Sequence, residues 1–242
     1  EKSLYVIEDC AQAHGAMYKG KSAGSIGHIG ASSFCQDKIM TTGGEGGMVT
    51  TNDEALWKKM WSYKDHGKNF DSVYNTQHPP GFRWLHDSFG TNWRMMEMQA
   101  VIGRLQLKLM PEWTAKRLEN MHKIQSAFAN SPYFTVHRPS DDYVHAAYKC
   151  YVQVNTGALP EGWSRDRIMA EINALGVPCF SGSCSEVYLE KAFEHTPWRP
   201  EQRLHNAQAL GESSLMFLVH PTLSEQSMQK TITAIQTVMA DI

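Results

Sequence analysis

Residues 29–51 read IGASSFCQDKIMTTGGEGGMVTT, and this stretch contains two short apolar runs on either side of a lysine. The run Ile29–Phe34 predicts one strand, and Met48–Thr51 predicts another. Between them lie Lys38 and the segment Thr41–Gly47, which holds four glycines. Such glycines are typical of tight turns with positive φ angles, or of a backbone that approaches a ligand closely. The stretch therefore predicts two strands joined by a loop that carries an amine.

The segments on both sides of this stretch extend the pattern to an α/β sheet. Leu4–Ile7 predicts a buried strand, and Asp9 follows it directly. Asn52 or Asp53 can cap a helix. One face of that helix would carry Leu56, Trp57, Met60 and Trp61. Short strands mixed with helices favour the α/β fold class.

The middle of the chain predicts a change of domain. Residues Phe70–Phe89 show no clear period and predict a long loop, which is often functional. Met95–Met110 has a helical pattern that Pro111 is expected to interrupt, with a second helix running to about Phe128. We therefore expect a cofactor-binding part of a large domain over residues 1–110, and a linking helix with a small domain over 111–242.

The last hundred residues predict a small α+β domain. Tyr148–Val154 alternates as a strand does, and Leu215–Val219 predicts another strand. Ser164 can cap a helix that stops at Gly176, and Ser224 can cap the final helix.

Composition excludes several classes of protein. The chain of 242 residues is 42% hydrophobic and 20% charged, with a net charge of -2. A basic stripe for nucleic acid is missing from the sequence, as is an apolar run long enough to span a membrane. The five cysteines form no CxxC pair, and no HExxH spacing occurs, so neither a disulfide framework nor a metal site is expected. A cytoplasmic protein with reduced thiols is the simplest interpretation.

Two side chains in these patterns are suited to chemistry. Asp9 follows a predicted strand, at the sheet edge where α/β proteins bind ligands, and its carboxylate could hold a proton on a bound heterocycle. It could equally cap a helix that begins at Ala11. Lys38 could act as a nucleophile in a desolvated site, or it could be an ordinary surface lysine. The glycine-rich segment matches neither a Walker P-loop nor GxGxxG.

The order of these motifs resembles one family, the DegT-like (DegT/DnrJ/StrS) sugar-nucleotide aminotransferases of pyridoxal-phosphate fold type I. The resemblance covers most of the chain. The motifs that carry it are Glu8–Gly15, Gly24–Gly27, Ser33-Phe34, Lys38, Gly44–Gly47 and Gly90–Met95. It implies the later part of a fold type I large domain, followed by a small α+β domain.

The resemblance also implies roles for five residues. Lys38 would be the Schiff-base lysine for pyridoxal 5'-phosphate and would later move protons. Asp9 would pair with the pyridine nitrogen, and Gln12 would lie near the phenolic oxygen. Ser33 would bind the cofactor phosphate. Asn92 would reach the phosphate of a neighbouring subunit, which implies a homodimer with shared active sites.

The implied reaction is transfer of an amino group, from glutamate, to a nucleotide-linked keto sugar, as in the synthesis of polysaccharide or antibiotic sugars. Two alternatives remain open. One is a related sugar dehydratase, in which histidine replaces the Schiff-base lysine. The other is a catalytically silent regulatory or scaffolding homologue. Cys35 departs from the family, since many members have histidine there, and the family's upstream segment, which supplies another phosphate loop, is expected to be missing.

Overall fold

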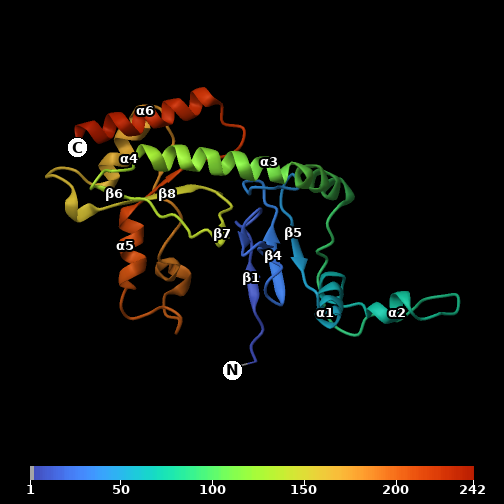
Figure 1. Cartoon of the computed structure of the whole chain (residues 1–242). Helices are drawn as coiled ribbons and strands as arrows, with labels where there is room; N and C mark the ends of the chain where they lie inside the picture. The colour runs from blue at the N-terminus through green and yellow to red at the C-terminus, as the bar shows by residue number, and fades with distance from the viewer. Residues whose placement is uncertain (1–2) are drawn as a thin grey trace. The chain divides into compact units, whose positions relative to one another are not determined.

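The computed structural model describes residues 3–242, and the chain divides into two compact units. The first comprises Glu1–Pro111 with Asp141–Ala146, and the second comprises Glu112–Ser140 with Ala147–Ile242. Figure 1 colours both along the chain. Helices and strands occur together in each unit, which confirms the predicted α/β class.

A three-stranded sheet organises the first unit. Its order is β1 (Ile7–Asp9), β4 (Ile29–Ser33) and β5 (Gly47–Thr50) (Figure 1). β1 runs parallel to β4, with Asp9 opposite Ala31, and β5 runs antiparallel to β4. The carboxyl ends of β1 and β4 therefore meet at the same edge of the sheet.

The predicted buried strand Leu4–Ile7 is wrong in both position and burial. The strand begins at Ile7, and Leu4 and Tyr5 are 69% and 70% exposed. Within the described residues β1 pairs only with β4, at the margin of the sheet, and Tyr5 contacts only the edge of the His28 ring among the ring contacts described there. An apolar run predicts burial only where a second surface exists to cover it.

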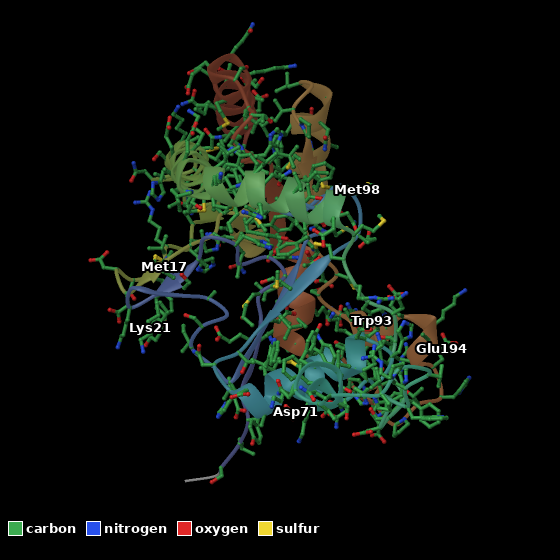
Figure 2. The ribbon with its side chains drawn as sticks, turned by 90° about the vertical axis from the view of Figure 1, so that its right-hand side faces the viewer. Met17, Lys21, Asp71, Trp93, Met98 and Glu194 are labelled. Atoms are coloured by element: carbon green, nitrogen blue, oxygen red, sulfur yellow. The ribbon has the colours of Figure 1, made fainter. Side chains whose placement is uncertain are left out.

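A second small sheet explains why a later segment belongs to the first unit. β2 (Met17–Tyr18) and β3 (Lys21–Ser22) form a hairpin, and β7 (Tyr143–Val144) pairs with the other side of β2. Figure 2 labels Met17 and Lys21 on this hairpin. Its two turn residues, Lys19 and Gly20, both have positive φ, as a type I′ turn requires.

Two helices follow β5. Asp53 caps α1 (Glu54–Lys64) by accepting the Leu56 N–H at 3.0 Å, which confirms a predicted cap. The segment expected as a loop begins instead with the short helix α2 (Phe70–Tyr74). Its Phe70 ring packs against two tryptophans of α1, a tertiary contact that the sequence period does not reveal. Those tryptophans are Trp57 and Trp61, with ring centroids 4.9 and 5.2 Å from that of Phe70.

The expected break at Pro111 does not occur. α3 runs without interruption from Glu97 to Ala127. Proline in a helix interior costs about 3 kcal/mol. The helix tolerates this cost because the turns before Pro111 pack in the first unit and those after it pack in the second. In the described part of the chain, neither α3 nor any other helix combines the length and the apolarity needed to cross a bilayer.

The second unit is a four-stranded antiparallel sheet with helices. The strand order is β6 (Phe134–Thr135), β8 (Cys150–Val154), β10 (Ser214–Phe217) and β9 (Cys179–Phe180). The helices are α4 (Arg165–Ala174), α5 (His205–Ser213), α6 (Glu225–Asp241) and three short 3₁₀ turns, Thr156–Ala158, Val187–Leu189 and Lys191–Phe193. Ser164 and Ser224 cap α4 and α6 as predicted.

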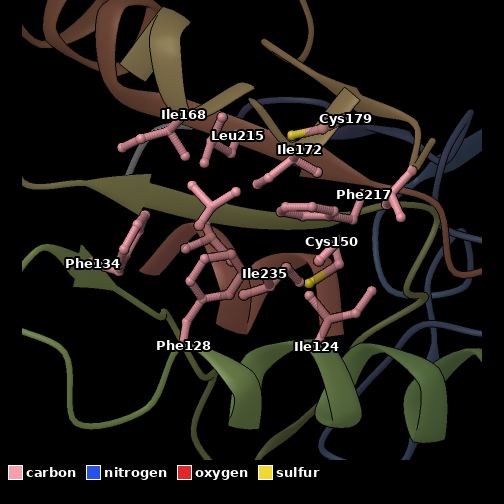
Figure 3. Close-up of a cluster of buried hydrophobic side chains, with 14 of the residues drawn as sticks. Ile124, Phe128, Phe134, Cys150, Ile168, Ile172, Cys179, Leu215, Phe217 and Ile235 are labelled. Atoms are coloured by element: carbon pink, nitrogen blue, oxygen red, sulfur yellow. The ribbon is translucent and has the colours of Figure 1, made fainter. Parts of the chain in front are cut away.

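The core of the second unit lies where α3 and α6 meet this sheet. Ile124 of α3, Phe128 just after its end, Ile235 of α6, and Leu215 and Phe217 of β10 are all fully buried in one cluster (Figure 3). Burying each such side chain contributes about 1.5–3 kcal/mol. This cluster is therefore the main source of stability in the second unit.

Candidate active site

Asp9 closes β1 and begins a turn. Its Oδ1 accepts the N–H of Ala11 at 3.0 Å, which fixes the carboxylate in an Asx turn. The next element is the strand β2, so the alternative interpretation of Asp9 as a helix cap is wrong. Gln12 lies in the same turn and is exposed. The fold thus presents an exposed carboxylate and an exposed amide close together at the sheet edge.

Ser33 shares both the edge and the face of Asp9. Asp9 pairs with Ala31, and Ser33 lies two residues further along β4. Side chains alternate along a strand, so Ser33 returns to the face that Ala31 and Asp9 occupy. The Ser33 Oγ accepts the N–H of Cys35 at 3.4 Å. Two of the predicted cofactor-binding residues are therefore brought to one side of one edge.

Lys38 lies in the loop between β4 and β5, which we call the lysine loop (residues 34–46). The loop is closed at its base, because the N–H of Phe34 donates to the carbonyl of Gly46 at 2.8 Å. The N–H of Thr42 donates back to the carbonyl of Phe34 at 3.1 Å, and the N–H of Lys38 to the carbonyl of Cys35 at 3.0 Å. Lys38 is half-buried in a loop with a defined shape.

The lysine loop is also tied across its middle by Cys35. The thiol of Cys35 lies 3.3 Å from a carboxylate oxygen of Glu45 and donates to it. The backbone N–H of Asp37 acts to lower the pKa of this thiol, but the Glu45 and Asp37 carboxylates and partial burial together outweigh it, and the pKa is raised. Cys35 is thus a protonated donor within the loop.

Glu8 organises the turn before β4. Its carboxylate accepts the backbone N–H groups of Gly24, Ile26 and Gly27 at 2.8, 2.7 and 2.6 Å. Partial burial acts to raise the pKa of Glu8, but these three bonds favour the ionised form and hold the pKa below its ordinary value. Glu8 thereby fixes the turn that leads into β4, the strand that carries Ser33.

Replacing Glu8 with glutamine is expected to destabilise the protein by about 1–2 kcal/mol at pH 7. Both carboxylate oxygens of Glu8 accept backbone N–H groups, and the glutamine side chain would replace one of these acceptors with an NH₂ donor. The folded state lowers the pKa of Glu8, so its stabilisation is complete above the ordinary pKa of about 4.3 and disappears as the pH falls through the lower, folded value. The difference in unfolding free energy between wild type and Glu8→Gln should therefore shrink below about pH 4. Urea titrations across pH measure it, with the exposed Glu201→Gln as control; a gap independent of pH would contradict this role.

Asn92 lies on a segment attached to the end of α1. It forms an isolated bridge with Asp65, and its Oδ1 accepts the Nε–H of Arg94 at 3.1 Å. Arg94 also lies 3.7 Å from the buried carboxylate of Asp65. Burial acts to raise the pKa of Asp65, but Lys68, Arg94 and Lys64 lower it. Because the Asn92 carbonyl is occupied, its amide nitrogen presents the two donor hydrogens that a phosphate would need.

The sequence alone did not identify the residues that support this site. Glu8 is the first residue of the motif Glu8–Gly15. Nothing in the sequence predicts that its carboxylate accepts three backbone N–H groups. In the sequence, Asp65 and Arg94 can be recognised only as charged residues. Two glutamines of α3, Gln99 and Gln106, contact the lysine loop. Their seven-residue spacing is the one signal that was available. Across residues 3–242, no three His, Cys, Asp or Glu side chains are arranged to hold a metal ion.

Comparison with known proteins agrees with this geometry. Residues 1–236 match the sequence profile of the DegT/DnrJ/EryC1/StrS aminotransferase family. The chain belongs to this family. The resemblance carried by the sequence motifs is thereby confirmed, and so is the fold expected from it.

Relatives of the chain include proteins named as enzymes of sugar metabolism. The GDP-perosamine synthase of Caulobacter vibrioides is 31% identical over 242 residues, covering 98% of this chain and 59% of that protein. A UDP-N-acetyl-3-dehydro-alpha-D-glucosamine 3-aminotransferase of Acidithiobacillus ferrooxidans is 29% identical, covering 96% and 57%. The crystal structure of an aminotransferase from Psychrobacter cryohalolentis superimposes with a TM-score of 0.96 at 66% identity, covering 99% and 62%. The chain thus spans about three fifths of the length of these family members.

Proposed function

We propose that the protein containing this chain transfers an amino group, from glutamate, to the keto carbon of a nucleotide-linked sugar, with pyridoxal phosphate as cofactor. The observation that carries the proposal is the lysine loop: a half-buried amine in a loop of defined shape, beside the edge where Asp9 and Ser33 share one face. Membership in a family whose relatives are named as sugar aminotransferases supports the same reaction.

The side chains at this edge fit the cofactor's functional groups. A carboxylate, Asp9, is suited to hold the proton on the pyridine nitrogen, and the amide of Gln12 is suited to donate to the phenolic oxygen. The hydroxyl of Ser33 is suited to the phosphate. When bound, pyridoxal phosphate supplies an electron sink for the carbon that gains or loses a proton.

Lys38 has two tasks in this proposal. Its amine attaches the cofactor covalently before substrate arrives. Once freed by the amino donor, the same amine would take a proton from the donor's α-carbon and pass it on during the exchange. The sugar half of the reaction reverses these transfers, so the whole exchange balances as amino acid plus keto sugar giving keto acid plus amino sugar.

Asn92 is proposed to serve the site of a second copy of the protein. Arg94 holds the Asn92 carbonyl, and the amide hydrogens can then donate to a phosphate oxygen of the partner's cofactor. This assignment makes the active enzyme a homodimer with shared sites.

The absorption spectrum of the full-length protein tests this function. We expect a visible band from lysine-bound cofactor, which borohydride removes while leaving the cofactor covalently trapped on the peptide containing Lys38. Glutamate should convert the band, and a panel of keto sugars linked to GDP, UDP and dTDP should restore it with formation of an amino sugar.

Other outcomes would replace the proposal. Glutamate-driven conversion followed by loss of a sugar hydroxyl, without amino sugar, would identify a dehydratase. Failure to bind pyridoxal phosphate at all would identify a catalytically silent homologue. Because Lys38 occupies the position at which the dehydratases have histidine, amino transfer is the outcome that the sequence favours.

A further inference from the structure

One face of α3 packs directly against the lysine loop. The face is formed by Gln99, Ile102, Gly103 and Gln106, whose spacing of three, four and seven residues places them on one side of a helix. All four precede Pro111, and they belong to the same unit as the loop. The contact is therefore internal to the first unit.

Two hydrogen bonds join this face to the loop, and they have opposite polarity. The Oε1 of Gln106 accepts the N–H of Thr41 at 2.8 Å. The Nε2 of Gln99 donates to the carbonyl of Glu45 at 2.8 Å. Thr41 and Glu45 both follow Lys38 in the loop, so the helix holds the chain at two points on its way back to β5.

Between these bonds the helix and the loop are in close contact. A Cβ added to Gly103 would lie 3.0 Å from the Cγ2 of Thr42, whose side chain is 1% exposed. A Cβ added to Gly43 would lie 3.0 Å from the Cδ1 of Ile102. Ile39 and Met40, which follow Lys38, are buried as well. The loop therefore has little room to move the backbone of Lys38.

Gln99 and Gln106 are the polar side chains that this half of α3 turns toward the lysine loop. Gln99 and Gln106 are half-buried, whereas the apolar side chains around them are exposed. Those exposed side chains are Met98 (labelled in Figure 2), Val101, Leu105, Leu107 and Leu109. A helix normally buries its apolar stripe. At the packed positions Gln99 and Gln106 supply amide hydrogen bonds to the loop, beside the apolar contacts of Ile102 and Gly103.

We propose that Gln99 and Gln106 are positioning residues that hold Lys38 in place through the lysine loop. The inference rests on the proposed role of Lys38 in attaching the cofactor. Neither glutamine touches a reacting atom; each fixes the backbone on which the amine is carried. Displacing a reacting group by about 1 Å can cost about a hundredfold in rate, so two bonds of this kind can matter to turnover.

The opposite polarities define a matched set of variants in the full-length protein. Gln106→Glu keeps an oxygen that can accept the Thr41 N–H, whereas Gln106→Leu does not. Gln99→Glu removes the donor and sets an oxygen against the Glu45 carbonyl. Gln99→Leu removes both this donor and the oxygen that accepts the Met96 N–H at 3.4 Å. Gln125→Leu is the control. Gln125 is a buried glutamine in the part of α3 that belongs to the second unit, and it donates to the carbonyl of His137 in that same unit.

We expect Gln106→Glu to retain turnover within about threefold, and Gln106→Leu, Gln99→Glu and Gln99→Leu to lower kcat by about ten- to a hundredfold. KM for the sugar should change little. The pH midpoint of the absorbance change of lysine-bound cofactor should shift in the three impaired variants. In protein freed of cofactor, amide hydrogen exchange at Thr41 should accelerate in Gln106→Leu and stay slow in Gln106→Glu. Gln125→Leu should lower thermal stability without altering the midpoint or kcat.

Equal effects of Gln106→Glu and Gln106→Leu, or impaired variants that lose only thermal stability as Gln125→Leu does, would overturn the inference. Lys38→Ala is measured alongside to separate the two hypotheses. If that variant turns over normally, the proposed function fails. If it is inactive while all the glutamine variants keep the wild-type midpoint and kcat, only the positioning role fails.

Discussion

Replacing Lys38 with alanine in the full-length protein will remove all borohydride-trapped cofactor and lower amino transfer by about 10²–10⁴-fold. Alanine has no amine to attach the cofactor, and a positioned base typically contributes that factor to the rate. Asp9, Gln12 and Ser33 remain, so the variant should still bind pyridoxal phosphate noncovalently. Turnover and trapped cofactor are to be measured on one preparation.

Lys21→Ala is the matched control for this variant. Lys21 is exposed on the β2–β3 hairpin, and an exposed lysine of this kind should change the unfolding free energy by no more than about 0.5 kcal/mol and leave turnover unaltered. If Lys38→Ala behaves as Lys21→Ala does in both assays, Lys38 is a surface charge and has no chemical role.

Replacing Phe128 with alanine will destabilise the protein by about 3–5 kcal/mol, the cost of a large cavity in a packed core. Phe128 is 1% exposed, and its ring centroid lies 4.7 Å from that of Phe134 and 5.6 Å from that of Phe217. Both neighbours belong to strands of the sheet, so the cavity opens between that sheet and the turn that follows α3. Urea denaturation of the full-length protein, monitored for the second unit, measures the loss.

Phe180→Ala is the comparison, because Phe180 lies on the outermost strand β9 and is 45% exposed. It should cost less than half as much as Phe128→Ala. At temperatures where Phe128→Ala remains folded, cofactor trapping at Lys38 should be normal, since the two residues belong to different units. Equal costs for the two phenylalanines would contradict the assignment of the core.

The local elements of the fold could be predicted from the sequence. Asp53, Ser164 and Ser224 cap helices because capping depends on a side chain and the backbone two or three residues away. The strands around the lysine loop were predicted for the same reason, since each is a short apolar run beside glycines. Pro111 misled the prediction, because tolerance of a proline depends on packing along the whole of α3, which no local pattern records.

In the candidate site, too, some residues could be predicted from the sequence and others could not. Asp9 follows from a strand end and Ser33 from the family resemblance, and the parallel register of β1 and β4 brings them to one face. Gln99 and Gln106 could not be recognised, because their partners lie more than fifty residues earlier in the chain. The role of Glu8 could not be recognised either, because its partners are backbone N–H groups, which every residue type except proline has. The sequence motifs indicate the candidate site residues. They do not indicate the hydrogen bonds that hold the backbone of those residues in place.

The return of β7 to the first unit has a practical consequence for domain dissection. An expression fragment that stops at Pro111, where the first segment of the first unit ends, would leave out Tyr143 and Val144. β2 would then present a bare row of backbone donors and acceptors, together with the ring of Tyr18, which now stacks on Tyr143. Unprotected strand margins of this kind recruit other chains and promote aggregation. A fragment design should therefore carry residues 141–146 through a short linker, so that β2 keeps its partner strand.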